Sequence, residues 1–165
     1  MYRRFPLVLA IALLTGAAAG AQPARKFEIV MVFTDRARAL YVHYDNPNGI
    51  PLNLESINVA PRGKPLYAVV LFRNCKPDDK GMCNIELDTI AYTPQGNVYG
   101  YRSDWQFWYR KPERPPGELQ IGRRNLGLTI DPGDPVGRWR VTATARDRIA
   151  NTESSAEWRF EVKPE

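Results

Sequence analysis

Apolar and polar residues alternate strictly along "RWRVTATARD" (residues 138–147), and this alternation limits what the stretch can form. Tryptophan, valine and alanine occupy every second position from Trp139 to Ala145, and arginine or threonine fills the positions between them. Successive side chains of a β-strand point to opposite faces, whereas a helix buries residues three and four apart. The stretch therefore predicts a strand with one face in a core and the other in water.

The rest of the chain has the same character. Short β-branched, aromatic or alternating runs are separated by turn residues. They occupy residues 27–34, 39–45, 66–73, 84–92, 99–110, 118–122, 125–130 and 156–162. In the run 39–45, Leu40, Val42 and Tyr44 are predicted to share one face of a strand. Fourteen prolines and twelve glycines suit loops better than helices. We expect an all-β fold, an antiparallel immunoglobulin-like β-sandwich of about seven to nine strands, over residues 27–165 as one domain.

The N-terminus has the three parts of a signal peptide. "MYRR" is positively charged, "FPLVLAIALLTGAAA" is apolar, and "AGA" ends in small residues at Ala21. The apolar run is shorter than the roughly 20 residues that span a membrane. We predict cleavage after Ala21, a flexible linker over residues 22–26, and export to the periplasm or the exterior of a bacterium. An uncleaved anchor helix is the alternative.

The charge of the chain argues against nucleic acid as a partner. Loss of Arg3 and Arg4 with the signal peptide lowers the formal net charge from +5 to +3. This small excess is spread along the sequence, whereas nucleic-acid binders concentrate basic residues in a patch or a stripe.

Two cysteines, Cys75 and Cys83, flank the turn-forming segment "KPDDKG". An even number of cysteines in an exported chain favours a disulfide, and this spacing suits a clip across a hairpin loop. A redox-active pair is the alternative, but it usually has the closer C-x-x-C spacing in an electropositive setting. We predict a structural disulfide.

The C-terminal quarter contains a D-x-x-G corner between two strands. In "LGLTIDPGDPVGRWRVTATARD", Asp134 and Gly137 form the corner, and Trp139 follows two residues later. This pattern resembles the end of the immunoglobulin-like and fibronectin-like modules of exported bacterial proteins. The resemblance implies a fold and no activity. Tyrosine usually ties such a corner through its hydroxyl, so here the indole N–H of Trp139 is the available substitute.

Residues for catalysis or metal binding are sparse. His43 is the one histidine, and a partly exposed strand position accounts for it better than a ligand or a catalytic base. The pairs Asp78–Asp79 and Asp131–Asp134 lie in turn-forming segments and lack the regular oxygen spacing of a calcium loop. We predict no catalytic residue, no metal site and no cofactor.

An outward-facing arginine row follows from the alternation. Arg138, Arg140 and Arg146 face away from the core and suit an anionic partner such as a lipopolysaccharide phosphate. The outward residues of the final strand are Glu157, Arg159 and Glu161. Adjacent antiparallel strands pair such charges across a sheet. We therefore favour a solvated, salt-bridged face.

Six aromatic residues lie within the eleven positions from Tyr99 to Tyr109. Alternation predicts one face of core residues and one polar face with a single ring, Trp108. The core face holds Tyr99, Tyr101, Ser103, Trp105, Phe107 and Tyr109, and the polar face holds Arg102, Asp104, Gln106, Trp108 and Arg110. The candidate binding residues are accordingly Trp108, Tyr109, Gln106 and Arg110. A bulge that turned Trp105 and Trp108 outward together is the alternative.

Three functions remain open from the sequence. The first is a non-catalytic module that contacts a protein partner in the cell envelope through a strand edge or the loops at one end. The second is a carbohydrate- or cell-wall-binding module that uses exposed rings around Trp108. The third, an unrecognised hydrolase, requires a concave polar pocket with His43 or paired carboxylates.

Overall fold

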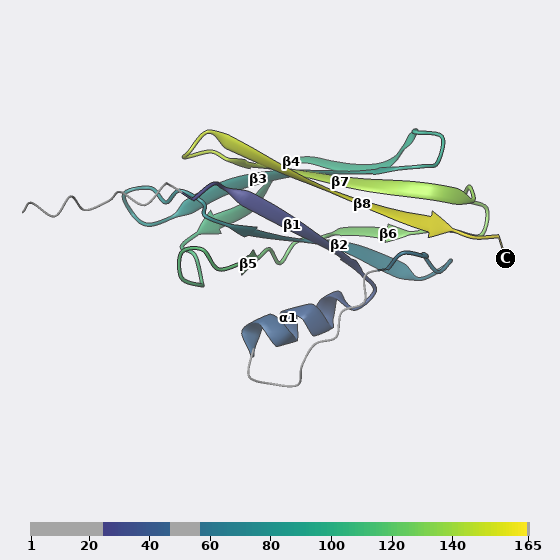
Figure 1. Ribbon diagram of the computed structural model, residues 1–165, viewed down its shortest axis with the longest axis horizontal. Helices are drawn as coiled ribbons and strands as arrows, with labels where there is room; N and C mark the ends of the chain where they lie inside the picture. Colours follow the sequence, from purple (N-terminus) through teal and green to yellow (C-terminus); the bar gives the residue numbers. More distant parts are fainter. Residues whose placement is uncertain (1–24, 47–56, 165) are drawn as a thin grey trace, which may run out of the picture.

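Two antiparallel sheets stack face to face in the computed structural model, which describes residues 25–46 and 57–164 (Figure 1). The sandwich prediction is confirmed, with eight strands in the described residues. The predicted signal peptide and most of the predicted linker lie outside these residues. Among the described residues, no helix is long and apolar enough to cross a membrane.

Each sheet contains four strands. The β1 sheet has β2 at its centre, with β1 on one side and β5 and β6 on the other. The β7 sheet has the order β4–β3–β7–β8. The bounds are β1 (Glu28–Thr34), β2 (Pro65–Arg73), β3 (Cys83–Tyr92), β4 (Val98–Arg110), β5 (Gln120–Ile121), β6 (Leu126–Thr129), β7 (Gly137–Asp147) and β8 (Thr152–Val162).

The core lies between the two sheets, on the faces that the alternation predicted for β3, β7 and β8. Every second residue of β3 from Cys83 to Ala91 is buried, as is every second residue of β7 from Trp139 onward. Phe160 of β8 stacks between Phe33 of β1 and Trp139 of β7. These rings join the two sheets across the sandwich.

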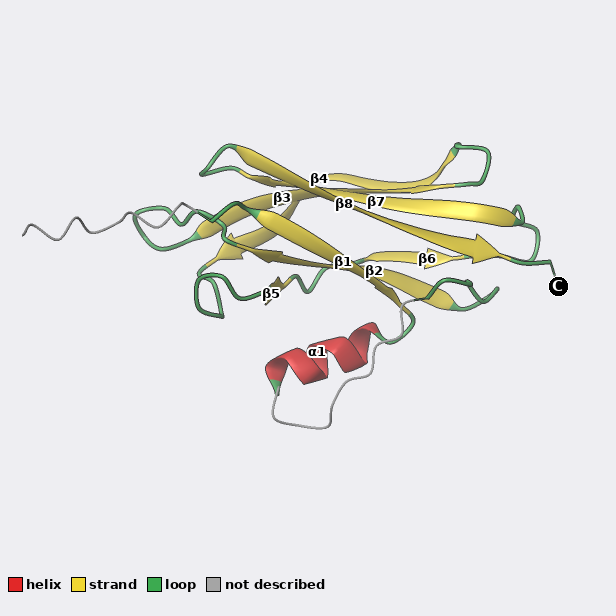
Figure 2. Cartoon of the chain, viewed as in Figure 1, coloured by secondary structure: helices red, strands yellow, loops and turns green. Residues whose placement is uncertain are grey.

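The prediction of a strand over residues 39–45 is wrong, because this segment belongs to a helix, α1 (Ala37–Asp45). Ala37, Leu40, Tyr41 and Tyr44 have the i, i+3, i+4, i+7 spacing of one helix face. Ala37 and Leu40 pack with Val69, Leu71 and Ile121 on the outer face of the β1 sheet. Figure 2 shows α1 against this face, outside the sandwich. The helix explains why β2 is buried on both faces.

One side of the sandwich is closed by the segment Ile57–Ala60. The Ile57 amide donates to the Phe33 carbonyl on the edge of β1. The Ala60 amide donates to the Glu161 carbonyl, and the Glu161 amide donates to the Asn58 carbonyl on the edge of β8. This segment therefore occupies backbone groups on the edges of both sheets, which would otherwise be open to pairing with another chain.

Bulges interrupt the pairing of β4 with β3. The register shifts between Ile85 and Glu86 and again between Leu87 and Thr89. A bulge places two residues of one strand opposite one of its partner and so breaks the alternation of faces. As a result Trp105, Phe107 and Trp108 are all buried, whereas Tyr101 and Tyr109, which alternation placed in the core, are exposed.

The corner before β7 is tied by an indole, as the sequence suggested. The Trp139 Nε1–H donates to the Pro135 carbonyl at 2.9 Å. The Asp134 carboxylate accepts from the Asp131 amide at 2.7 Å and from the Tyr99 hydroxyl at 2.7 Å. The Arg62 guanidinium donates to the Asp131 carbonyl at 2.6 Å. The aspartates thus hold the turn locally.

A Gly122→Ala substitution tests the contact between β4 and the segment after β5. A Cβ atom at Gly122 would lie 1.9 Å from the buried Phe107 ring. The ring or the backbone must move, and overpacking of this kind costs about 1–3 kcal/mol of unfolding free energy. Chemical denaturation measures the loss. Gly100→Ala in β4, where no atom lies within 4 Å, is the control and stays near wild type. Equal stability of both variants would contradict the contact.

Tyr99→Phe tests the corner. The substitution keeps the ring against Trp139 and removes hydroxyl bonds to Asp134 and to the Thr129 carbonyl. We expect a loss of about 1 kcal/mol of unfolding free energy at neutral pH. Tyr101→Phe, at a ring that is 71% exposed, should change little.

The pH dependence of the Tyr99→Phe effect follows from the hydroxyl. Burial, together with the hydrogen bond to Asp134, raises the pKa of Tyr99 to about 12. Because this pKa lies above the unfolded value near 10, the stabilisation is complete below about pH 10 and is lost as the pH rises through 12. The difference in unfolding free energy between the wild type and the Tyr99→Phe variant should therefore decrease across that pH range. A difference in unfolding free energy that stayed constant across this range would show that ionisation of the Tyr99 hydroxyl does not affect the stability of the corner.

Candidate functional site

Trp108, the ring that alternation placed on the polar face, faces the core. It is 2% exposed, because the bulge at Ile85/Glu86 turns it inward opposite Ile85. Phe72 meets the ring edge-on with centroids 4.9 Å apart, and the Arg110 guanidinium lies 4.0 Å from the ring centroid on the solvent side. The Trp108 Nε1–H donates to the Arg110 carbonyl at 2.9 Å. The outward position predicted for Trp108 is therefore wrong, and the bulge leaves Trp105 and Trp108 both buried instead of turning them outward together.

The other three predicted site residues do not form one surface with this ring. Gln106 pairs with Glu86, and Tyr109 pairs with Asn84. Both side chains are exposed, on the opposite face from Trp108. Arg110 covers the indole and forms an ion pair with Glu113 at 3.0 Å. The bulged strand therefore separates residues that simple alternation had placed together.

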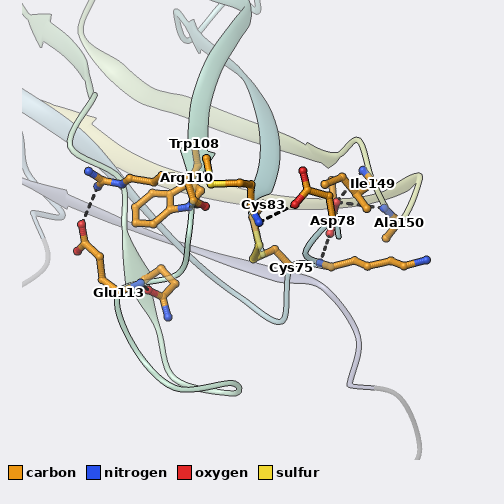
Figure 3. The surroundings of a disulfide bond; sticks show 12 residues. Cys75, Asp78, Cys83, Trp108, Arg110, Glu113, Ile149 and Ala150 are labelled. Carbon is orange, nitrogen blue, oxygen red and sulfur yellow. Dashed lines mark hydrogen bonds and ion pairs between the residues drawn. A yellow bond between two sulfur atoms is a disulfide. The ribbon is translucent and has the colours of Figure 1, made fainter. Parts of the chain in front are cut away.

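The predicted disulfide is confirmed beside Trp108. Cys75 and Cys83 are bonded, with their Cα atoms 6.0 Å apart. Figure 3 shows the bond together with Trp108, Arg110 and the turn at Ile149 and Ala150. The buried Asp147 carboxylate accepts from the backbone amides of Lys76, Ile149 and Ala150. The disulfide and Asp147 fasten the loops at this end of the sandwich, which is a structural role.

The remaining titratable candidates have local roles. His43 lies in α1, half-buried, and not on a strand. Asp78 accepts from the amides of Lys80 and Met82 within its own loop. In the described part of the chain, no three histidine, cysteine, aspartate or glutamate side chains gather as metal ligands.

The outer face of the β7 sheet carries the predicted charge pairs. Arg140 contacts Glu157 at 3.5 Å, and Glu157 also contacts Arg159 at 2.6 Å. Arg146 contacts Glu153 at 3.2 Å and Asp88 at 2.7 Å. The salt-bridged face is therefore confirmed for these residues. Arg138, opposite Glu161 in the register, forms no ion pair with any described residue.

Two open hollows adjoin Arg138 and Arg159. The first has a volume of about 380 Å³ and lies between Arg138, Arg140 and the turn that joins β3 to β4. Its walls include Tyr92, Thr93, Pro94 and Gly96. The second, about 350 Å³, extends to Asn58 and Glu161 and shares Arg138 and Arg159 with the first.

Two exposed side chains of β4 lie on the same outer face as Tyr92, outside the lining of either hollow. Tyr101 is 71% exposed and pairs with Ile90 across the sheet, and Val98 is 56% exposed and pairs with Tyr92. The Arg140 guanidinium lies 4.2 Å from the Tyr92 ring centroid, a cation–π contact. We call Tyr92, Val98, Tyr101, Arg138, Arg140 and Arg159 the tyrosine–arginine face.

The sequence indicated only part of this face. Alternation correctly placed Arg138, Arg140 and Arg159 outward. It missed Tyr101, which was assigned to the core, and it did not associate Tyr92 with the arginines. The signal for Tyr92 was present: Ile85, Leu87 and Ala91 of β3 face inward, so Ile90 and Tyr92 must face outward.

Comparisons with known proteins do not identify a family. No protein-family model matches the sequence, and no curated protein is similar to it. Solved structures with some similarity include the sporulation control protein Spo0M of Bacillus subtilis, at 11% identity and a TM-score of 0.41. The chain is also similar to the CARDB domain of a Pyrococcus furiosus protein in complex with di-metal ions (14% identity, TM-score 0.40) and to a family 123 glycoside hydrolase from Clostridium perfringens (12% identity, TM-score 0.42).

The extent of these similarities differs. The similarity to Spo0M covers 84% of this chain and 50% of Spo0M, and the similarity to the CARDB domain covers 84% of this chain and 92% of that domain. The similarity to the hydrolase covers 83% of this chain and 27% of the hydrolase. The chain thus spans half the length of Spo0M and about a quarter of the hydrolase. None of the three carries a function over to this protein.

Trp108→Ala separates a core role from a binding role. The substitution removes a buried ring that contacts Phe72 and Arg110, so we expect a loss of about 3–5 kcal/mol of unfolding free energy. Tyr109→Ala, at an exposed neighbour, should lose less than about 1 kcal/mol. Chemical denaturation measures both. A Trp108→Ala variant with wild-type stability would contradict the buried position.

Proposed function

We propose that the protein is a non-catalytic, exported binding module that contacts a protein partner through the tyrosine–arginine face. The observation that carries the proposal is the gathering of three arginines and the half-buried Tyr92 around two open hollows at one end of the β7 sheet, with the exposed Tyr101 on the same outer face. Tyrosine and arginine are enriched at the centres of protein interfaces, whereas lysine is depleted there. This composition favours a protein partner in the cell envelope.

The strand order supports an immunoglobulin-like module. The β7 sheet corresponds to the C′–C–F–G arrangement of such domains, with β3 as C and β7 and β8 as F and G. The β1 sheet corresponds to A, B and E. Immunoglobulin-like sandwiches present loops and strand ends as contact surfaces, and the two hollows lie at such an end. Export is supported by the Cys75–Cys83 disulfide, since disulfides persist in oxidising compartments.

The two other functions have less support. A carbohydrate module needs an accessible ring at Trp108, but this ring is buried, with Arg110 over it and Phe72 against it edge-on. A hydrolase needs His43 or paired carboxylates in a polar pocket. His43 lies in α1, and the two hollows contain a single carboxylate side chain, that of Glu161. We therefore retain the binding module.

Partner capture with matched variants tests the proposal. Immobilised mature protein is exposed to envelope extract of the source bacterium, and bound proteins are identified by mass spectrometry. We expect Tyr101→Ser to reduce recovery of the main partner at least about tenfold, because interface tyrosines often contribute about 2 kcal/mol or more. Tyr109→Ser is the control, since this ring is 55% exposed at the other end of β4 and should leave recovery unchanged. Equal recovery by all three proteins would exclude this face.

A further inference from the structure

We propose that the two hollows bind a short acidic segment of the protein partner, laid in extended form across the ends of β7 and β8. Arg138 and Arg159 contact its carboxylates, and Tyr92 and Pro94, which lie on the β3 side of Arg138, contact an apolar side chain two residues away from the nearer carboxylate. The inference rests on the proposed function and adds to it the chemistry of the partner.

The arrangement of the hollows fits an extended peptide. One hollow begins at the β3–β4 turn and crosses Arg138 and Arg140 of β7, and the other continues past Arg159 of β8 to Asn58. Asn58 belongs to the segment that pairs along the edge of β8. Four neighbouring chain segments, spaced about 4.8 Å apart, give a path of about 14 Å, enough for about four extended residues.

The charge of the path favours carboxylates. Three guanidinium groups, those of Arg138, Arg140 and Arg159, face two carboxylates, those of Glu157 and Glu161. Glu157 is shared between Arg140 and Arg159, so each of these arginines retains donors for a ligand. Arg138 forms no ion pair with any described residue and lines both hollows, which makes it the central anchor.

A peptide fits this surface better than a dense polyanion. Glu161 lies opposite Arg138, and Glu157 contacts Arg140 and Arg159, so a ligand with closely spaced phosphates would approach these carboxylates as well as the guanidiniums. Separate carboxylates on alternate residues can meet the arginines without that repulsion. The Tyr92 ring and Pro94 add apolar surface to the wall of the hollow, which matches an aliphatic side chain. The partner segment is therefore expected to carry one apolar and two acidic residues at every second position, on the side that faces this surface.

Titration with designed peptides tests this inference on the isotope-labelled mature protein. The probe is an acetylated hexapeptide with valine at position 1, glutamate at positions 3 and 5 and serine at the positions between them, so that valine and both glutamates share one side. Its control has glutamine in place of glutamate. We expect amide shifts at Gly96, Arg138 and Arg159 and affinity at least tenfold tighter for the acidic probe, falling as salt is added. Arg138→Glu/Arg159→Glu should lose at least tenfold in affinity, and the neutral Arg138→Gln/Arg159→Gln pair should lose less.

The matched control is Lys76→Glu/Lys80→Glu, which makes the same charge change in the disulfide loop, beyond the opposite end of β3. It should bind the acidic probe as wild type does. Thermal unfolding verifies that each variant is folded. Wild-type affinity in the Arg138/Arg159 variants would overturn the inference, as would equal loss in the lysine control. Tighter binding of pyrophosphate than of the peptide, at the same amides, would replace the peptide with a phosphate ligand.

The same variants distinguish this inference from the proposed function. If partner capture depends on Tyr101 but the Arg138→Glu/Arg159→Glu variant captures the partner as wild type does, the proposed function holds. The inference that the partner segment is acidic is then wrong. If the acidic probe binds through Arg138 and Arg159 while capture does not depend on Tyr101, the hollows bind an acidic peptide. The proposal that the whole tyrosine–arginine face contacts the partner is then wrong.

Discussion

The register between β7 and β8 is the constraint on which the rest of the structure depends. Eleven consecutive residue pairs join these strands without a bulge, from Gly137–Val162 to Asp147–Thr152. A slip of one residue in either strand would exchange its buried and exposed faces, moving Trp139 into water and arginines into the core. Burial of unpaired guanidinium groups is too costly to compete. The same register that builds the core therefore also presents the arginine side chains together on the outer face.

The faces of β3, β7 and β8 were predictable from sequence because each strand keeps the regular period of two. Helix α1 was not predicted, although Ala37, Leu40, Tyr41 and Tyr44 have helical spacing. The segment 39–45 also matches a strand, since Leu40, Val42 and Tyr44 alternate. Tertiary packing decides between helix and strand for this segment. Strand β2 is apolar on both faces, and a short amphipathic helix covers its outer face. The sequence feature that indicated this cover was the adjacent pair Val69 and Val70, because neighbouring strand residues point to opposite faces and both faces of β2 are therefore apolar.

Strand β4 shows why the candidate site could not be taken from alternation alone. Its bulges depend on pairing with β3, which lies in another part of the sequence, and each bulge reverses the faces beyond it. Trp108 therefore moved into the core, and Tyr101 moved out of it. The arginines of the candidate site lie on the regular strands β7 and β8 and were placed correctly. Tyr101, on the irregular strand, was not.

The ion pairs on the outer face do not compete strongly with a ligand. Exposed pairs such as Arg140–Glu157 and Arg159–Glu157 contribute at most about 1 kcal/mol each. They limit the conformations of the long side chains, and the Tyr92 ring does the same for Arg140. An incoming carboxylate then meets guanidinium groups that have already lost part of their conformational entropy, which lowers the cost of binding. The weak pairing of these arginines is thus compatible with the proposed recognition role.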